Sequence, residues 1–279
     1  MSGGYAITVV EYAYNEAFAE SNLLYAAGSG SRWAPFSFAV LEGHGRLALV
    51  DTGVGDTDYQ RHIARKQGLD GLVLAQDRLT ELGFSADDVT DVLVTHAHYD
   101  HMGNLDAFPG ATFHVQRREL EKWPLALAAP PHLHYFNESV DPATLESASR
   151  IRSEGRLNLL DGDVHDLLPG IEARAAHDTH TFGSMWFTVL PADGGQPYVL
   201  VGDNVYCYEN LETHNERGWI VPIGQATGSN YASILCIDEI GHAAGRESRR
   251  VIPFHEARVA DEFGGRRNRL GHATTEICR

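Results

Sequence analysis

The sequence predicts one large domain of mixed α/β type, and three observations support this prediction. The chain has 279 residues, which is more than a typical domain but within the range of one large α/β or layered domain. Hydrophobic residues make up 43% of the chain, enough for a well-buried core. A strand-rich opening followed by helices occurs in both halves, and no linker-like segment separates them. We therefore expect a single domain over residues 1–263.

In the first half, runs of β-branched and aromatic residues predict strands, and apolar residues at helical spacing predict helices. Residues 42–46 have the composition of a hairpin connection between two strands. Residues 72–82 have helical spacing, and a second helix begins at Gln116 and is expected to stop at Pro124. The expected strands are Ile7–Tyr12, Phe36–Leu41, Leu47–Val50, Val92–Thr95 and Ala111–Val115.

The second half follows the same pattern after a less regular segment. Residues 124–156 are rich in alanine and contain several prolines, so irregular helices and loops are expected there. A helix is expected over residues 231–244. Residues 264–279 contain four arginines and few apolar side chains, which predicts a flexible C-terminal tail. The expected strands are Leu157–Leu160, Ile171–Ala176, Met185–Leu190, Tyr198–Val201 and Arg250–Pro253.

The composition limits the partners of the protein. A formal net charge of −16 disfavours nucleic acid and anionic membrane surfaces, because no broad basic face is available to neutralise phosphates. No stretch approaches the roughly eighteen apolar residues of a transmembrane helix. The three cysteines are widely spaced and form no C-x-x-C pair, which predicts a reducing compartment without disulfides. The N-terminal residues lack the basic start and apolar run of a secretory signal, so we expect the cytoplasm.

The most informative segment is His96-Ala97-His98-Tyr99-Asp100-His101, which holds three imidazoles and a carboxylate within six residues. Imidazole nitrogens and carboxylate oxygens are the usual ligands of zinc and related divalent cations. The pattern therefore predicts a metal site. The alternative is a polar turn in which histidines cluster without binding a ligand.

Further candidate ligands follow apolar strands, as His96 does. His180, Asp203 and His255 each come shortly after a predicted strand. Loops at strand ends are held by a rigid scaffold and remain open to substrate, so these loops could converge on a metal centre. His177 competes with His180, but the Thr-x-Gly-Ser that follows favours His180, whereas His255 could instead be a buried core histidine. The histidines expected on the surface or in packing are His114, His132, His134 and His242.

Five motifs follow one another along the chain. They are Asp51-Thr52-Gly53, His96-x-His98-x-Asp100-His101, His180-Thr181-Phe182-Gly183-Ser184, Gly202-Asp203 and His255. In this order they resemble the motifs of the metallo-β-lactamase superfamily, and the resemblance spans residues 36–256. It implies a four-layer αβ/βα sandwich, in which two β-sheets lie face to face with helices outside and a site at one edge.

The resemblance also implies two divalent metal ions held by seven side chains. The first metal is matched to His96, His98 and His180, the second to Asp100, His101 and His255, and Asp203 bridges both. A carboxylate has two oxygens and can span metals about 3.5–4 Å apart. Histidine at position 98 favours zinc, because the resemblance implies glutamate at this position in the di-iron members of the superfamily. Asp51 is expected to orient a ligand imidazole, although an aspartate in a turn is the alternative.

Within the superfamily, the sequence is most similar to N-acyl homoserine lactonases. Residues 101–104 and 113–120 resemble the segment that follows the metal motif in that family, and Tyr206 matches a tyrosine that faces the substrate carbonyl. The resemblance implies a quorum-quenching hydrolase that opens a lactone ring with a metal-bound hydroxide. Tyr206 would stabilise the oxyanion and Asp100 would relay a proton. Phe182 and Ser184 depart from the family pattern and leave the exact substrate open.

Two other functions are compatible with the sequence. One is a hydrolase of the same fold that acts on an amide, a lactam, a thioester or the substrate of an aromatic ring-opening reaction. This alternative stays open because one fold hosts many reactions. The other is a metal-dependent or ligand-sensing binding protein without turnover. The expected partner is a small-molecule substrate. Residues 21–38, which include Trp33, are expected to form part of the mouth of the substrate site. The apolar run around Trp33, Phe36 and Phe38 could line a pocket or form a homodimer contact.

Overall fold

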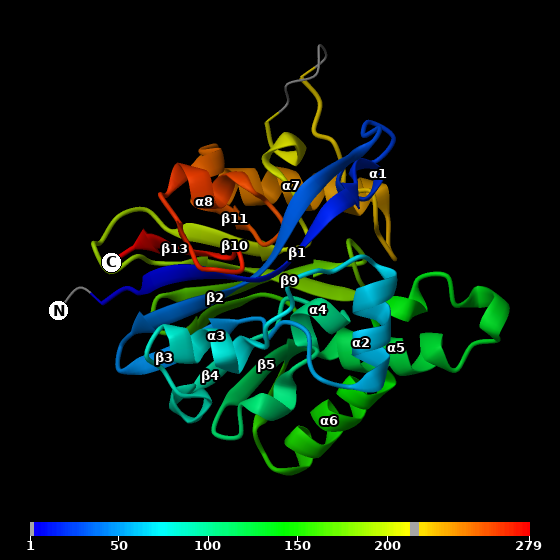
Figure 1. Cartoon of the computed structure of the whole chain (residues 1–279), viewed down its shortest axis with the longest axis horizontal. Coiled ribbons are helices and arrows are strands. Elements are labelled where there is room, and N and C mark those ends of the chain that lie inside the picture. Colours follow the sequence, from blue (N-terminus) through cyan, green and yellow to red (C-terminus); the bar gives the residue numbers. More distant parts are fainter. Residues whose placement is uncertain (1–2, 213–217) are drawn as a thin grey trace.

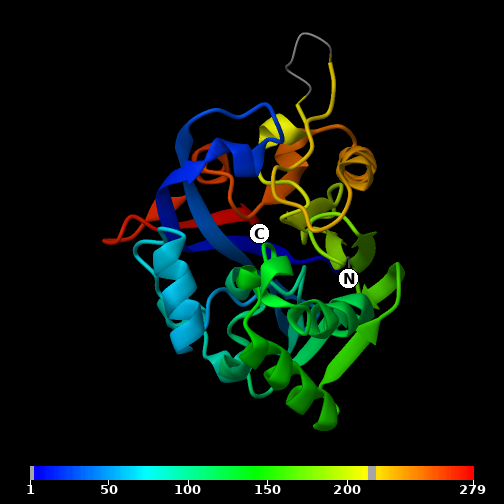
Figure 2. The same ribbon diagram turned by 90° about the vertical axis from the view of Figure 1, so that its right-hand side faces the viewer.

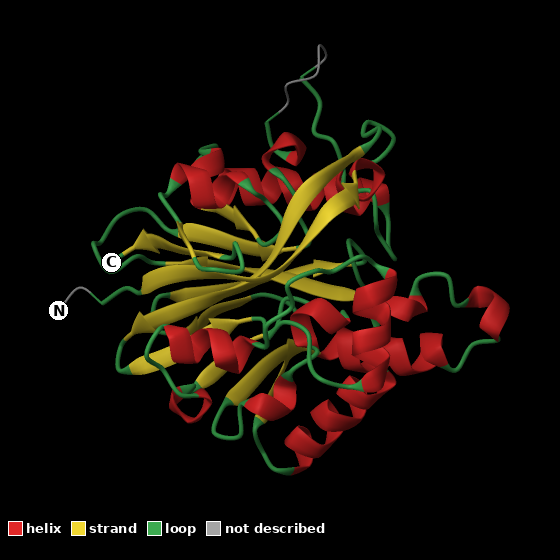
Figure 3. Cartoon of the chain, in the orientation of Figure 1, coloured by secondary structure: helices red, strands yellow, loops and turns green. Residues whose placement is uncertain are grey.

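The computed structural model describes residues 3–212 and 218–279. Within these residues two β-sheets pack face to face, and helices cover the outer face of each sheet (Figure 1). Figure 3 shows the strands in the middle of the molecule and the helices outside them. The predicted four-layer αβ/βα sandwich is therefore confirmed.

The first sheet combines strands from the N-terminal half with two strands from the C-terminus. Its strands are β1 (Ala6–Ala19), β2 (Ser31–Gly43), β3 (Arg46–Val50), β4 (Asp91–Leu93), β5 (Thr112–Gln116), β6 (Leu157–Leu160), β12 (Arg266–Arg267) and β13 (Ala273–Cys278). They lie in the order β12-β13-β1-β2-β3-β4-β5-β6. Pairing is antiparallel from β12 to β3 and parallel from β3 to β6. Because β3 and β4 are parallel, the loops that follow them leave from the same edge of the sheet.

The second sheet is smaller and comes from the C-terminal half. Its strands are β7 (Val164–Leu168), β8 (Ile171–His177), β9 (Gly183–Val189), β10 (Tyr198–Gly202) and β11 (Val251–Pro253). They lie in the order β11-β10-β9-β8-β7, and β10 and β11 form the parallel pair. The loops that follow β10 and β11 therefore also leave from one edge.

Helices cover the outer faces of both sheets, and short helices and turns lie in the loops near the strand ends. The α-helices are α1 (Glu20–Leu23), α2 (Asp58–Lys66), α3 (Ala75–Glu81), α4 (Tyr99–Met102), α5 (Arg117–Leu127), α6 (Pro142–Ser153), α7 (Asn230–Ala243) and α8 (Arg258–Glu262). The 3-10 turns are η1 (Ala86–Asp88), η2 (Leu105–Ala107), η3 (Pro131–Leu133), η4 (Asn137–Ser139), η5 (Tyr208–Asn210) and η6 (Ser248–Arg250). Seen from the side, α2, α5 and α6 lie on one side of the sheets and α7 on the other (Figure 2). None of the helices in the described part of the chain has the length and apolar content needed to span a bilayer.

Alternation of side chains along the strands explains how each sheet buries both faces. In β1, Val9 belongs to the core between the two sheets, whereas Val10 belongs to the core between the first sheet and its helices. In β9, Phe187 faces the first sheet, and Trp186 packs with residues of α7. Successive side chains of a strand point to opposite faces, so every second residue of a central strand enters a different core.

The expected strands are confirmed, with longer bounds for β1 and β2. The predicted stop at Pro124 is wrong, because α5 continues to Leu127. Pro124 lies on the exposed face of this helix, where water can hydrogen-bond the carbonyl of Leu120 that loses its donor. The segment after it contains the regular helix α6, which Asp141 caps by accepting a hydrogen bond from the backbone N–H of Ala143.

The predicted flexible tail at 264–279 is also wrong. Residues of β13 pair with the edge of β1, with Thr274 opposite Val10 and Cys278 opposite Ile7. Arg267 of this segment is held as well, because it pairs with Glu11 at 3.0 Å. Backbone pairing with a free strand edge stabilises a segment whose own apolar content is low.

Candidate metal centre

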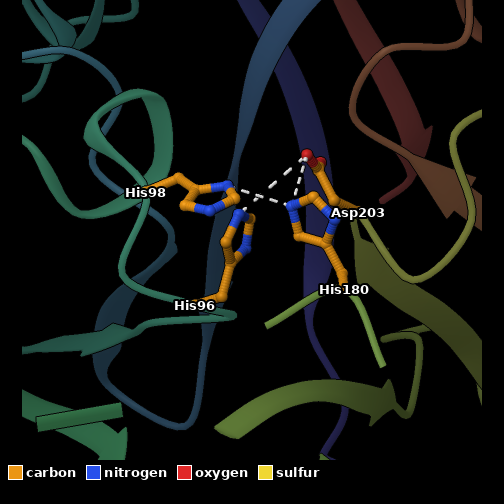
Figure 4. A group of neighbouring side chains, drawn as sticks. All are labelled: His96, His98, His180 and Asp203. Atoms are coloured by element: carbon orange, nitrogen blue, oxygen red, sulfur yellow. Dashed lines mark hydrogen bonds and ion pairs between the residues drawn. The ribbon is translucent and has the colours of Figure 1, made fainter. Parts of the chain in front are cut away.

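Seven side chains that the sequence marks as candidate ligands gather where strands of both sheets end. They form two groups, and within each group the ligand atoms lie within 4.8 Å of one another. The groups are His96, His98, His180 and Asp203, and Asp100, His101, Asp203 and His255. Figure 4 shows the first group, whose four side chains point toward one another from three different loops.

Asp203 belongs to both groups because its two carboxylate oxygens face opposite ways. Oδ1 lies 3.1 Å from Nε2 of His101 and 3.1 Å from Nε2 of His255. Oδ2 lies 3.4 Å from Nε2 of His180 and 3.9 Å from Nε2 of His96. One carboxylate thus joins the two groups.

The loop after β4 carries four of the seven side chains. His98 precedes the short helix α4, which contains Asp100 and His101. This helix is fastened to the loop after β3, because the backbone N–H and the hydroxyl of Thr52 both donate to the carbonyl of His101, at 2.7 and 3.0 Å. The hydroxyl of Tyr12 donates to the carbonyl of Asp100 at 2.7 Å. These bonds fix the direction in which both side chains leave the helix.

The position of Asp203 depends on the glycine before it. Gly202 has φ +51, and a Cβ atom there would lie 2.6 Å from the hydroxyl oxygen of Thr95. Only glycine combines this left-handed backbone with such a close approach. Gly202 therefore lets the end of β10 pack against Thr95 and brings Asp203 to the cluster.

Most of the imidazoles are fixed by a hydrogen bond at the ring nitrogen that faces away from the cluster. The partners of Nδ1 are Thr95 Oγ1 at 3.0 Å for His96, Asp51 Oδ2 at 2.7 Å for His101, the carbonyl of Gln225 at 2.8 Å for His180 and the carbonyl of Pro35 at 2.9 Å for His255. Partners of this kind fix the tautomer and orientation of an imidazole that binds metal through its other nitrogen. The predicted contact of Asp51 with an imidazole of the cluster is confirmed.

The inward-facing atoms fit divalent cations. Among the described residues, four such atoms are buried and have no hydrogen-bond partner in the structure. They are Nε2 of His96, His101 and His255, and Oδ1 of Asp203. Buried polar atoms are almost always satisfied, and three imidazole nitrogens with a carboxylate oxygen are the donor set that zinc prefers. The cluster can therefore hold metal ions.

The electrostatics of the first group favour the metal-binding forms. Burial and the neighbouring imidazoles lower the pKa of His96 and His180, and lower that of His98 to about 3, so these rings are neutral and have a free lone pair. Burial opposes the ionisation of Asp203, but the charges of His101 and His255 hold the pKa of this carboxyl well below its usual value. Neutral imidazoles and ionised carboxylates are the forms that bind cations.

Tyr206, which the resemblance implies at the site, lies beside the cluster. Its side chain is buried, with its ring centroid 5.4 Å from that of His255 and 5.7 Å from that of His180. Burial and the charges of Asp203 and Asp100 raise the pKa of its phenol well above the usual value. The phenol is therefore protonated at neutral pH and can donate a hydrogen bond.

A cavity of about 1090 Å³ opens beside His98 and His180. Four residues of the segment 21–38, which is expected at the substrate mouth, line this cavity, but Trp33 is not among them. Trp33 instead stacks on Tyr14, with ring centroids 6.0 Å apart. Three further segments line the cavity with side chains that include Lys66 and Gln67, His132, His134, Tyr135 and Phe136, and Gln225 and Thr227.

The structure also decides between alternatives that the sequence leaves open. His177 lies outside the cluster and pairs with the amide oxygen of Gln116 at 3.2 Å, whereas His180 lies inside it. Sequence reasoning missed the carbonyls of Pro35 and Gln225, because a backbone acceptor has no side-chain signature. It also missed Glu119, a fully buried carboxylate whose four-residue spacing to the buried Trp123 was the available signal.

Comparisons with known proteins agree with this geometry. The curated N-acyl homoserine lactonase of a Bacillus species is 25% identical over 173 residues, or 59% of this chain and 61% of that protein. A probable metallo-hydrolase of Mycobacterium tuberculosis is 35% identical over 81 residues, and the match covers about a quarter (26%) of each protein. The chain thus spans less than two thirds of the length of these relatives.

Solved structures share the fold along most of the chain. An N-acyl homoserine lactone hydrolase with the product N-hexanoyl-L-homoserine at its catalytic metal centre has a TM-score of 0.68 and 19% identity, with 94% of this chain and 97% of that chain covered. The dizinc quorum-quenching lactonase AidC has a TM-score of 0.65 and 17% identity, with 92% of both chains covered.

The family model described as the metallo-beta-lactamase superfamily matches residues 33–255, which include all seven side chains of the cluster. By its sequence, by its four-layer sandwich and by the two groups joined at Asp203, this chain belongs to the metallo-β-lactamase superfamily.

Proposed function

We propose that this protein is a dinuclear, metal-dependent hydrolase that opens the ring of an N-acyl homoserine lactone or a related cyclic ester. The observation that carries the proposal is the position of Asp203, whose two oxygens face two different groups of imidazoles. A carboxylate in this position can bridge two cations, and paired cations are typical of hydrolases that activate water. We propose zinc for both, because imidazole nitrogens dominate the donor set.

In this proposal His96, His98 and His180 hold one cation, Asp100, His101 and His255 hold the other, and Asp203 contacts both. Cations bound there would lower the pKa of water to about 7 and place positive charge beside the carbonyl oxygen of a cyclic ester. Water would then add to the carbonyl carbon, and the ring C–O bond would break to give a hydroxy acid.

Two side chains of the cluster have further roles in the proposed reaction. The protonated phenol of Tyr206 donates a hydrogen bond to the oxyanion that forms from the ester carbonyl. Burial opposes the ionisation of Asp100, but His101 and His255 keep the pKa of its carboxyl below the usual value, so it is ionised. An ionised Asp100 can accept a proton from the attacking water and return it to the departing alkoxide oxygen.

The substrate class rests on the relatives and on the cavity. Lactonases occur both among the curated relatives and among the structures with the same fold. The cavity beside His98 and His180 has a volume in the range of small-molecule sites, and acidic partners such as nucleic acids are disfavoured by the net charge of −16.

The test is turnover of the zinc-loaded protein on a graded series of lactones, compared with lactams, amides and thioesters of matched size. We expect lactones to be opened fastest, with the product heavier by one water, and about two zinc ions per chain. Asp203→Asn should abolish turnover, whereas Asp58→Asn, which changes a fully exposed carboxylate, should not. Faster turnover of the lactams or thioesters would refute the lactone assignment, and metal binding without any turnover would refute the enzyme.

A further inference from the structure

Glu119 is a buried carboxylate that belongs to neither group of candidate ligands. It lies in the first turn of α5 and is fully buried. Oε2 accepts hydrogen bonds from the backbone N–H of Ala97 and from Nε1 of Trp123, both at 2.8 Å. Oε1 accepts from the hydroxyl of Thr181 at 2.6 Å and from the backbone N–H of Gly183. Both oxygens of this side chain are therefore fully used.

Three of the four donors come from the two loops that carry the histidines of the first group, and the fourth, Trp123, lies on α5 itself. Ala97 lies between His96 and His98, at the edge of the first sheet. Thr181 directly follows His180, at the edge of the second sheet. One carboxylate thus ties together two loops that are 84 residues apart in the chain, as the positions of Ala97 and Thr181 show (181 minus 97).

The backbone at Gly183 confirms how closely the second loop approaches α5. A Cβ atom at Gly183 would lie 2.7 Å from the backbone nitrogen of Glu119. Any side chain there would push the loop away from the helix, so glycine permits the contact. The loop that carries His180 is therefore seated directly on the helix that carries Glu119.

We propose that Glu119 is a positioning residue, which sets the separation between the His96–His98 loop and His180 and thereby the affinity of the first metal. The inference rests on the proposed dinuclear function. Hydrogen-bonded carboxylates behind metal ligands fix ligand geometry, and their loss commonly costs 10- to 100-fold in metal affinity. None of the donors to Glu119 is adjacent in sequence to His101 or His255, so the second metal should be little affected.

Glu119→Gln is the variant that tests this role, because it keeps the size of the side chain. An amide has one acceptor oxygen, so its NH₂ group must face two of the four donors. The hydroxyl of Thr181 can turn to accept, but the N–H of Gly183 cannot, so the His180 loop loses its attachment. Glu121→Gln is the matched control, since Glu121 lies on the same helix with 60% of its side chain exposed.

The affinity of each site is measured separately by titrating apo-protein with Co²⁺ and following its visible absorption. In a His255→Ala background, which keeps the first group intact, Glu119→Gln should weaken Co²⁺ binding about 10- to 100-fold. In a His98→Ala background, which keeps the second group intact, Glu119→Gln should change the Co²⁺ affinity by less than about threefold. The control Glu121→Gln should leave the Co²⁺ affinity unchanged in both backgrounds.

Thr181→Val provides a second variant if Glu119→Gln does not fold, since it removes a single donor. It should weaken the first site in the same direction, by a smaller factor. Equal weakening of both sites, or no weakening of either while the wild-type protein binds two ions, would overturn the role of Glu119 and leave the proposed function standing. A wild-type protein that binds no metal would overturn the proposed function itself.

Discussion

Replacing Asp51 with asparagine changes one atom and should weaken the second metal site. Asp51 is fully buried and accepts three hydrogen bonds, from the N–H of Thr95, the hydroxyl of Thr95 and Nδ1 of His101, each at 2.7 Å. Its backbone has φ +67, a left-handed conformation that asparagine tolerates as well as aspartate does. The substitution therefore leaves the chain path intact and alters only the hydrogen bonds.

The amide group of the variant forces a change of tautomer at His101. The amide oxygen can keep the bond to the N–H of Thr95, which places the NH₂ group toward His101. The ring must then accept at Nδ1 and carry its proton on Nε2, the atom that faces Asp203. Binding of a cation at Nε2 requires the remaining proton to sit on Nδ1, where the NH₂ group of the variant cannot accept it, so binding costs the variant this hydrogen bond.

Two estimates of the resulting loss agree. Loss of a hydrogen-bonded carboxylate behind a metal ligand costs about 10- to 100-fold in affinity, which corresponds to about 1.4–2.7 kcal/mol. Loss of a hydrogen bond to a charged group costs about 1.5–3 kcal/mol. Calorimetric titration of the apo-protein with Zn²⁺ should therefore show one of its two binding steps weakened by this amount.

Asp56→Asn is the control, because Asp56 is an exposed carboxylate on the same loop and pairs with Arg61. This control should bind both ions with wild-type affinity. Wild-type affinity for both ions in Asp51→Asn would refute the reasoning, since His101 would then need no carboxylate partner to present Nε2.

Four further outcomes are expected. Tyr206→Phe should lower kcat roughly ten- to a thousandfold while bound metal is unchanged, and an unchanged rate would show that the phenol does not contact the oxyanion. Removal of metal by a chelator should lower Tm, and Zn²⁺ should restore it, because an ion that binds the folded state stabilises it; a Tm independent of metal would contradict the site. Gly202→Ala should destabilise the protein by more than about 1 kcal/mol in denaturant unfolding, because its Cβ meets Thr95 at a left-handed backbone position. Burial opposes the ionisation of Asp91, but hydrogen bonds from His114 and two other neighbours hold its pKa below 3.8. The stability that Asp91→Asn removes should therefore be constant above about pH 5 and vanish as the pH falls through the lowered pKa, and a loss independent of pH would contradict the stabilisation of the ionised carboxylate.

The sequence was most informative where a residue type has few alternative uses. The spacing of His96, His98, Asp100 and His101 identified the loop after β4, and the order of the later motifs identified His180, Asp203 and His255. All seven side chains come together in the structure. Ten of the thirteen strands in the described residues were predictable as well, because β-branched and aromatic runs have few other environments in a folded domain.

The sequence failed where stability comes from a distant partner. The last sixteen residues look like a tail by composition, yet β13 completes the first sheet because β1 offers unpaired backbone groups at its edge. Two other errors were local: α5 passes through Pro124 on its exposed face, and α6 begins at Asp141 and Pro142, a cap and first-turn proline that are a local signal of a helix start.

The sequence by itself determined the chemistry of this protein, namely which side chains can bind metal and in which loops they lie. The tertiary structure alone decided which atoms face one another. It placed the two oxygens of Asp203 toward different groups, gave His255 the carbonyl of Pro35, and set Glu119 between the loops of His98 and His180. The physical reason is that residue type fixes what an atom can bind, whereas packing between two sheets fixes the distances at which it does so.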